Sequence, residues 1–168
     1  MVKIKNAVNN DLKGVFFDYG GVLEDLEYNE KSFHRGVSVL RDILKMHEIE
    51  INFDVLVVML KAGQEEYSNW YKSNDFRELP NEKLWSLFFL KDLCREKSVK
   101  DRVYALSDEL SSIYEYYLYR RRPVQDVKMV IKTLFHAGYV LALISNTISK
   151  TLIPERMKKY GIDIYFSF

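Results

Sequence analysis

The sequence predicts an α/β fold: a Rossmann-like core with a parallel sheet, into which a bundle of helices is inserted after the first strand. Two short apolar segments, Val15–Phe17 and Tyr139–Ile144, are each followed by polar residues, as at the carboxyl ends of buried parallel strands. Between them, apolar residues recur at helical spacing. We therefore expect an α/β core formed by residues 1–27 and 123–168, and a helical insert formed by residues 28–122.

The first apolar segment ends at a carboxylate followed by two glycines. Asp18 comes directly after Phe17, and Gly20-Gly21 lets the backbone turn sharply and lets another group approach closely. Ligands of open α/β sheets bind just outside the carboxyl ends of the strands, so Asp18 is a candidate reactive group. The alternative interpretation is an ordinary β-turn in which Asp18 only caps the next segment.

Four amphipathic helices with short connections are predicted within the insert, which indicates a small antiparallel bundle. The first has an apolar stripe that repeats every three to four residues: Phe33, Val37, Leu40 and Leu44. The four helices are expected at residues 29–47, 54–72, 80–94 and 98–117, with Ser98 capping the last. An acidic loop, Glu24–Glu27, is expected to lead into the insert.

The chain after the insert predicts a helix at 125–137 that ends at Gly138, then the second strand, then a helix at 149–160 that ends at Gly161. Pro154 is compatible with the last helix only within its first turn. Residues 163–168 are expected to form a third strand. At the other end of the chain, Val2–Lys5 is expected to be a short edge strand and Asn9–Asp11 a turn.

Composition limits the classes of function. The 168 residues are 48% hydrophobic and 29% charged with a net charge of +1, which argues against a general nucleic-acid or membrane-surface binder. We interpret the one basic run, Arg120–Arg122, as a solvated helix end. The single cysteine, Cys94, cannot form an internal disulfide, and the sequence has no long apolar segment; both features favour a cytoplasmic protein.

The two strand ends resemble motifs of the haloacid dehalogenase superfamily of hydrolases. Asp18-Tyr19-Gly20-Gly21-Val22-Leu23 resembles its first motif in the Asp-x-Gly-Gly-Val-Leu version, and Ser145-Asn146 after an apolar strand resembles its second. The insert resembles the helical cap that many members carry directly after the first motif. The resemblance implies a Rossmann-like core with a cap, and a hydrolase of the phosphatase type that acts on a small phosphorylated metabolite.

The resemblance also implies roles for individual residues. Asp18 would be the nucleophile and would form an aspartyl phosphate. Mg²⁺ would be bound by Asp18 and by the main-chain carbonyl of Gly20, together with an acidic group from a later motif. The phosphoryl oxygens would be bound by Ser145, by Asn146 and by the backbone amides of Tyr19 and Gly20.

The sequence departs from the family pattern in two places. Gly20 stands where typical phosphatases of the family have a second Asp that protonates the leaving group; Asp25, Glu24, Tyr67 and His34 are candidate replacements, each with a structural role as the favoured interpretation. The family's Lys motif and acidic pair, which follow its third strand, have no counterpart in this sequence. Two alternatives to a phosphatase thus stay open: a catalytically impaired homologue that works as a binding or assembly module, and a haloacid dehalogenase.

The missing motifs affect the expected sheet as well. Without the strands that carry them, Val15–Phe17 would be an exposed apolar edge, and such an edge invites pairing with another chain. We expect a homodimer that buries this edge, or cover by Val2–Lys5, or a chain that is part of a longer protein.

Overall fold

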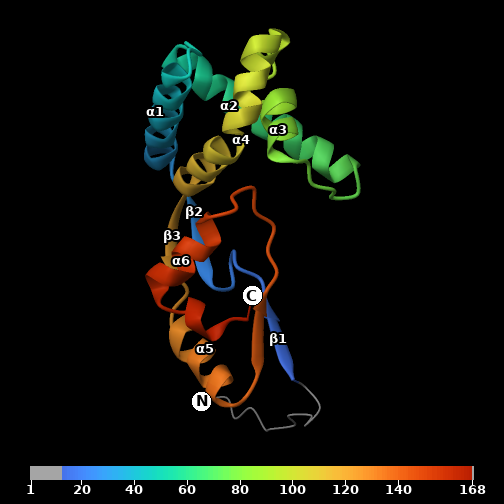
Figure 1. The fold of residues 1–168 in the computed structure, drawn as a ribbon. Coiled ribbons are helices and arrows are strands. Elements are labelled where there is room, and N and C mark those ends of the chain that lie inside the picture. Colours follow the sequence, from blue (N-terminus) through green and yellow to red (C-terminus); the bar gives the residue numbers. More distant parts are fainter. Residues whose placement is uncertain (1–12, 168) are drawn as a thin grey trace. The chain divides into compact units, whose positions relative to one another are not determined.

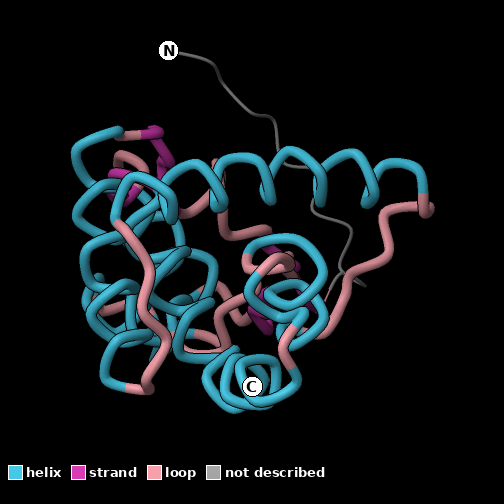
Figure 2. Tube along the Cα trace, turned by 90° about the horizontal axis from the view of Figure 1, so that it is seen from above, coloured by secondary structure: helices cyan, strands magenta, loops and turns pink. Residues whose placement is uncertain are grey.

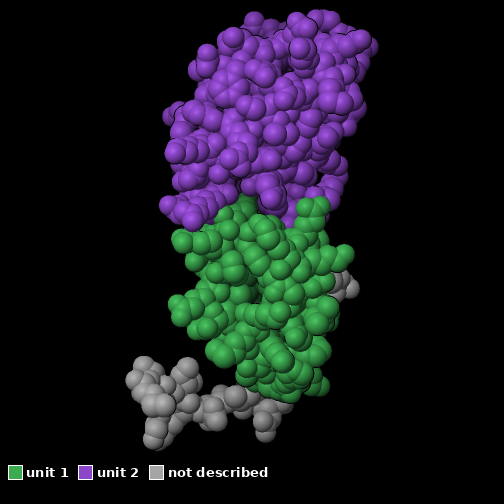
Figure 3. Space-filling view, turned by 90° about the vertical axis from the view of Figure 1, so that its left-hand side faces the viewer, with its two compact units in different colours: residues 1–26, 121–146, 153–168 green, residues 27–120, 147–152 purple. Residues whose placement is uncertain are grey.

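The computed structural model describes residues 13–167, so the strand expected at Val2–Lys5 and the turn expected at Asn9–Asp11 lie outside the described residues. The chain divides into two compact units (Figure 3). The α/β unit consists of residues 1–26, 121–146 and 153–168, and the helical unit of residues 27–120 and 147–152.

The α/β unit contains a parallel pair of strands, as predicted. Strand β1 (Gly14–Phe17) lies beside β4 (Val140–Leu143), with Gly14 opposite Val140 and Phe17 opposite Leu143 (Figure 1). Helix α5 (Val127–His136) packs against β4 and ends before Gly138, whose φ of +89° is the left-handed conformation expected of a glycine after a helix.

Helix α6 (Leu152–Tyr160) ends before Gly161, which also has a positive φ, and Pro154 lies in its first turn as predicted. The prediction of a third strand at residues 163–168, however, is wrong. Residues Asp163–Tyr165 form a 3₁₀ turn, and only Phe166 forms a parallel bridge, with Leu141. The reason is local: the N–H groups of Tyr165 and Phe166 bond to carbonyls three residues earlier and are not available to a sheet.

The two faces of the β1–β4 pair differ in exposure. Val15, Phe17 and Leu143 belong to an apolar cluster with α5 and α6, in which Leu141 is fully buried. Side chains of the other face remain exposed: Phe16 is 69% exposed and Ile144 is 66% exposed. Within residues 13–167, the apolar core of this unit therefore lies on one side of the sheet only.

The helical unit contains three of the four predicted helices as continuous elements, and the remaining one is interrupted. Figure 2 shows the helices of the described residues in cyan. Asn29 caps the first helix by accepting a hydrogen bond from the Ser32 amide at 2.9 Å. The predicted stripe Phe33, Val37, Leu40 and Leu44 is buried. The helices are α1 (Glu30–Met46), α2 (Phe53–Ser73), α3 (Asn81–Leu84) and α4 (Lys97–Leu118).

The helix predicted at 80–94 is interrupted. After α3 the chain forms a π-helix, Trp85–Phe89, in which the Leu90 amide bonds to the Trp85 carbonyl, and then a 3₁₀ turn, Leu93–Arg95. Trp85 is fully buried, and its indole donates to the Ser111 hydroxyl on α4 at 2.8 Å. The wider π turn thus accommodates a buried Trp with a satisfied N–H, which a residue pattern does not reveal.

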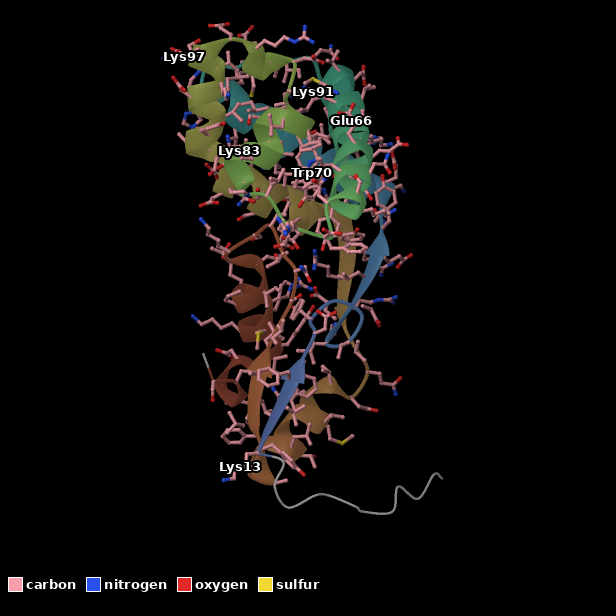
Figure 4. All side chains as sticks on the ribbon, turned by 90° about the vertical axis from the view of Figure 1, so that its right-hand side faces the viewer. Lys13, Glu66, Trp70, Lys83, Lys91 and Lys97 are labelled. Atoms are coloured by element: carbon pink, nitrogen blue, oxygen red, sulfur yellow. The ribbon has the colours of Figure 1, made fainter. Side chains whose placement is uncertain are left out.

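Ion pairs between residues that are far apart in the sequence join elements of this unit at its surface. Lys91 bonds to both carboxylate oxygens of Glu66, at 2.5 and 2.6 Å, and links the segment after the π-helix to α2 (Figure 4). The pair is exposed, so its contribution to stability is small, about 0–1 kcal/mol.

Three local predictions are wrong. The expected acidic loop Glu24–Glu27 is part of a strand, β2 (Glu24–Tyr28), and Arg120–Arg122 is part of a strand, β3 (Tyr119–Pro123), which pairs with β2. Pairing satisfies the backbone groups of both segments, so neither is a solvated loop or helix end. Ser98 does not cap α4: its hydroxyl donates to Glu96, the residue at the N-cap.

Residues 147–152 belong to the helical unit rather than to the predicted core. Polar groups of α4 hold this segment: Glu115 accepts from the Thr147 hydroxyl at 2.7 Å and from the Ser149 amide at 2.9 Å. The Ser149 hydroxyl also bonds to the Ser112 hydroxyl at 3.0 Å. These side-chain contacts between distant segments explain why a division based on sequence order placed the boundary differently.

Close packing at Gly63 generates a stability prediction. A Cβ added there would lie 2.7 Å from the Phe88 carbonyl oxygen and 2.8 Å from the Phe89 Cα. We expect Gly63→Ala to be net destabilising in urea unfolding, because overpacking costs about 1–3 kcal/mol and exceeds the ~1 kcal/mol gained from helix propensity. The control is Glu65→Ala, an exposed position on the same helix, which should change stability by less than about 0.5 kcal/mol. A Gly63→Ala protein as stable as the wild type would contradict the close approach.

Candidate active site

The two candidate residues, Asp18 and Ser145, both lie just beyond the carboxyl-terminal end of the β1–β4 strand pair. Because the strands are parallel and Phe17 is opposite Leu143, both carboxyl ends point the same way. The Ile144 amide donates to the Phe17 carbonyl at 2.9 Å, which continues the pairing to the last residue before Ser145. Asp18 and Ser145 thus follow neighbouring strand ends, where ligands of α/β sheets bind.

A tight turn holds the backbone next to Asp18. The Tyr19 carbonyl accepts hydrogen bonds from the amides of Leu23 (2.9 Å) and Glu24 (3.1 Å), and Gly21 has a φ of +76°. Only glycine adopts this conformation without strain, so the predicted sharp turn is confirmed. The Asp18 side chain is exposed and therefore open to a substrate from solvent.

The groups around Asp18 differ in their availability to a phosphate. The Tyr19 amide donates to Oδ1 of Asp18 at 2.6 Å, so a phosphate would have to displace that bond to use this donor. The Tyr19 ring is buried and belongs to the apolar cluster of the unit. Ser145 is half-buried and Asn146 is exposed.

The last residue of this turn, Glu24, belongs to a buried ion cluster. The Glu24 carboxylate is 0% exposed; its Oε2 accepts from Nη1 of Arg121 at 2.8 Å, and its Oε1 accepts from Nε of Arg156 at 2.6 Å. The Tyr160 hydroxyl donates to the same Oε1. Removing one member of such a cluster leaves a buried charge unpaired and costs about 3–5 kcal/mol.

No local sequence pattern marks this cluster, so it was not predicted. Glu24 is 97 residues from Arg121 and 132 residues from Arg156. The one available signal is the spacing of Arg156 and Tyr160, which places them on the same face of a helix. Glu24 is also removed from the candidate proton donors, because both carboxylate oxygens accept bonds from buried cations.

Two members of the cluster, Arg156 and Tyr160, and the nearby Tyr19 have shifted pKa values. Burial lowers the pKa of Arg156, but the bonds and charge of Glu24 outweigh it, so the net pKa is raised. Burial, followed by the hydrogen bond to Glu24, raises the pKa of Tyr160 to about 12. Burial and the Glu24 charge also raise the pKa of Tyr19. The charged guanidinium of Arg156 and the neutral phenols of Tyr160 and Tyr19 are thus favoured at ordinary pH.

The other candidate proton donors have partners or surroundings of their own. His34 lies 3.2 Å from Glu30, and Tyr67 stacks on Trp70; both belong to the helical unit. Asp25 is exposed on β2. Among the contacts of residues 13–167, none assigns any of these three side chains to catalysis.

The donors next to Asp18 suit a magnesium ion in type. Mg²⁺ prefers hard oxygen ligands and is often bound through one or two carboxylates with several waters and substrate oxygens. The Asp18 carboxylate and the Gly20 carbonyl are such ligands. Among residues 13–167, no group of three or more His, Cys, Asp or Glu side chains is arranged to hold a metal ion.

Comparison with solved structures shows similarity to a proposed phosphatase from Clostridium difficile (16% identity, TM-score 0.39), a dehalogenase (18%, 0.40) and a predicted phosphoglycolate phosphatase from Haemophilus somnus 129PT (19%, 0.39). The matches cover 93%, 94% and 93% of this chain but only 59%, 61% and 60% of those chains. This chain thus spans about three fifths of their length. No protein-family model and no curated protein matches the sequence. Within the described residues, no helix is both long enough and apolar enough to cross a membrane.

The raised tyrosine pKa values predict a loss of stability in alkali. An unfolded Tyr ionises near pH 10, whereas Tyr160 ionises near 12 in the folded chain and the buried Tyr114 even higher, chiefly because of burial. Neutral buried phenols therefore contribute stability that is fully present below about pH 10 and is lost as the pH rises toward 12. We expect the fraction of unfolded protein to rise over this range, together with the part of the tyrosinate absorbance at 295 nm that comes from the buried tyrosines.

The matched variants for this titration are Tyr160→Phe and Tyr116→Phe. The first removes one raised group and should weaken the alkaline loss, whereas Tyr116 is exposed and should leave it unchanged. Stability that stays constant from pH 9 to 12 would contradict the assigned shifts.

Proposed function

We propose that this protein is a hydrolase of the phosphatase type, in which Asp18 attacks a small phosphorylated metabolite. The observation that carries the proposal is the register of β1 and β4, which puts Asp18 and Ser145 after neighbouring strand ends. An exposed carboxylate after one strand end, with a hydroxyl and an amide after the neighbouring strand end, supplies the groups for attack on phosphorus and for binding phosphoryl oxygens. A cytoplasmic location, inferred from the single Cys, is part of the proposal.

In the first step, an Asp18 carboxylate oxygen forms a bond to phosphorus while the bond from phosphorus to the leaving oxygen breaks. The Ser145 hydroxyl and the Asn146 amide donate to the phosphoryl oxygens. Mg²⁺, when bound by the Asp18 carboxylate and the Gly20 carbonyl, supplies positive charge that offsets repulsion between carboxylate and phosphate. Water then attacks phosphorus of the aspartyl phosphate, which releases phosphate and restores Asp18.

Gly20 affects which substrates react fast. The leaving oxygen takes up a proton as it departs, and Gly20 has no side chain to supply one. We therefore propose that esters with acidic leaving groups, such as aryl phosphates, are hydrolysed faster than alkyl phosphates.

The activity test compares hydrolysis of p-nitrophenyl phosphate, with and without Mg²⁺, by the wild type and variants. We expect Asp18→Asn to lower kcat by about 10³-fold or more, because an amide is a poor nucleophile. Ser145→Ala should lower it by about 10²–10³-fold, as for the loss of one transition-state donor.

The control is Asp126→Asn, the same change at an exposed position of the α/β unit whose left-handed conformation Asn tolerates. Equal rates for wild type and Asp18→Asn would refute the proposal. Release of halide from a 2-haloacid instead of phosphate release would favour the dehalogenase alternative, and no turnover of either would favour a binding or assembly module.

We also propose that two copies of the chain pair through β1. Within the described residues β1 pairs only with β4, and Phe16 next to this edge is 69% exposed. A strand edge with an exposed apolar side chain favours pairing with another strand.

Sedimentation velocity tests the dimer. We expect a dimer for the wild type and a shift toward monomer for Phe16→Lys, because a charge on the strand disfavours edge pairing. Ile164→Lys, a similar change at a residue that is 72% exposed in the 3₁₀ turn Asp163–Tyr165, should leave the dimer intact. A wild-type protein that stays monomeric at all concentrations would exclude this pairing.

A further inference from the structure

We infer that Glu24 is a positioning residue, which holds the turn after Asp18 and the helix after Ser145 in one fixed arrangement. The inference rests on the proposed function and extends it to a buried residue that touches no substrate. Three sets of contacts in the α/β unit support it: one to the turn, one to α6 and one to β3.

The backbone of Glu24 closes the turn that starts at Asp18. Its amide donates to the Tyr19 carbonyl at 3.1 Å, and its carbonyl accepts from the Gly21 amide at 2.8 Å. Gly20 and Glu24 also form a bridge of the β type. A displacement of Glu24 would therefore displace the turn, and with it Asp18 and the Gly20 carbonyl.

The side chain of Glu24 binds α6, the helix that follows Ser145 along the chain. Oε1 accepts from Nε of Arg156 at 2.6 Å and from the Tyr160 hydroxyl. A second nitrogen of Arg156 donates to the Tyr160 hydroxyl and, at 3.3 Å, to the Arg121 carbonyl on β3. The guanidinium thus has a single orientation, fixed by a carboxylate, a phenol and a backbone oxygen.

The other carboxylate oxygen binds β3. Oε2 accepts from Nη1 of Arg121 at 2.8 Å, with the Arg121 side chain 5% exposed and that of Glu24 fully buried. Charged hydrogen bonds of this kind are short and directional, and no solvent competes with them here. One carboxylate therefore fixes the turn, a strand and a helix at defined distances.

Stability alone does not require such a cluster. Well-packed apolar residues often replace buried ion pairs without loss of stability. An apolar residue would fill the same space, but it would not fix the orientation of the turn relative to α6. The ionic contacts do fix this orientation. It matters because a misplacement of about 1 Å at a reacting group costs about 10²-fold in rate.

The test measures kcat and KM for p-nitrophenyl phosphate in Glu24→Gln and Tyr160→Phe. Glu24→Gln keeps the shape and removes the charge; we expect kcat to fall by about 10²-fold with KM changed by less than about threefold. Tyr160→Phe removes only one hydroxyl and should have a smaller effect of the same kind. Glu155→Gln, an exposed carboxylate beside Arg156 on α6, is the control and should match the wild type.

A double-mutant cycle separates positioning from general loosening. If Glu24 acts by aligning Asp18 with Ser145, Glu24→Gln should lower kcat by less than about threefold once Ser145 is already Ala. A full, multiplicative loss in the Ser145→Ala background would overturn the inference, as would an increase of KM with kcat unchanged. If Glu24→Gln fails to fold by circular dichroism, the same cycle with Tyr160→Phe decides.

Failure of the proposed function is distinguishable from failure of this inference. Equal activity of wild type and Asp18→Asn refutes the nucleophile. In that case, amide hydrogen exchange of Leu23 and Glu24 without substrate decides whether the turn is held from α6. Faster exchange in Tyr160→Phe than in Glu155→Gln supports the holding role, and equal exchange overturns it.

Discussion

The parallel pairing of β1 with β4 is the constraint on which the candidate site depends. Asp18 and Ser145 are 127 positions apart in the numbering, and only the register Phe17 opposite Leu143 brings their strand ends together. The Ile144 amide bond to the Phe17 carbonyl extends the register to the edge of the site. A slip by one residue would turn the side chains of either strand to the opposite face and would separate the two groups.

A second constraint fixes the backbone turn that follows Asp18. The turn after Asp18 is closed by backbone hydrogen bonds to Tyr19, and the residue that ends the turn, Glu24, is held by two buried arginines. The exposed carboxylate of Asp18 thus lies next to a turn whose last residue is fixed. A side chain that is exposed to solvent has few contacts of its own, so its position depends on the rigidity of the backbone that carries it.

The helical unit shows how far periodicity specifies structure. Regular apolar stripes in α1, α2 and α4 predicted these helices closely, because burial of one face determines them. The π-helix Trp85–Phe89 was not predictable, since it depends on the fit of Trp85 against Ser111 on another helix. The placement of residues 147–152 likewise follows from hydrogen bonds of Glu115, which lies far away in the sequence.

The sequence by itself determined the parallel strand pair, the sharp turn at Gly21, the amphipathic helices and the two strand ends that are followed by Asp18 and Ser145. Each of these features depends on local pattern or backbone conformation. The tertiary structure alone decided that Glu24 is a buried ion-pair residue on a strand rather than a residue of an exposed acidic loop. It also decided that Arg121 is an ion-pair partner rather than a solvated charge, and that Asp163–Tyr165 is a turn rather than a strand. The outcomes at Glu24 and Arg121 depend on contacts between distant segments, whose free energies no local pattern encodes, whereas hydrogen bonds over three residues close the turn Asp163–Tyr165.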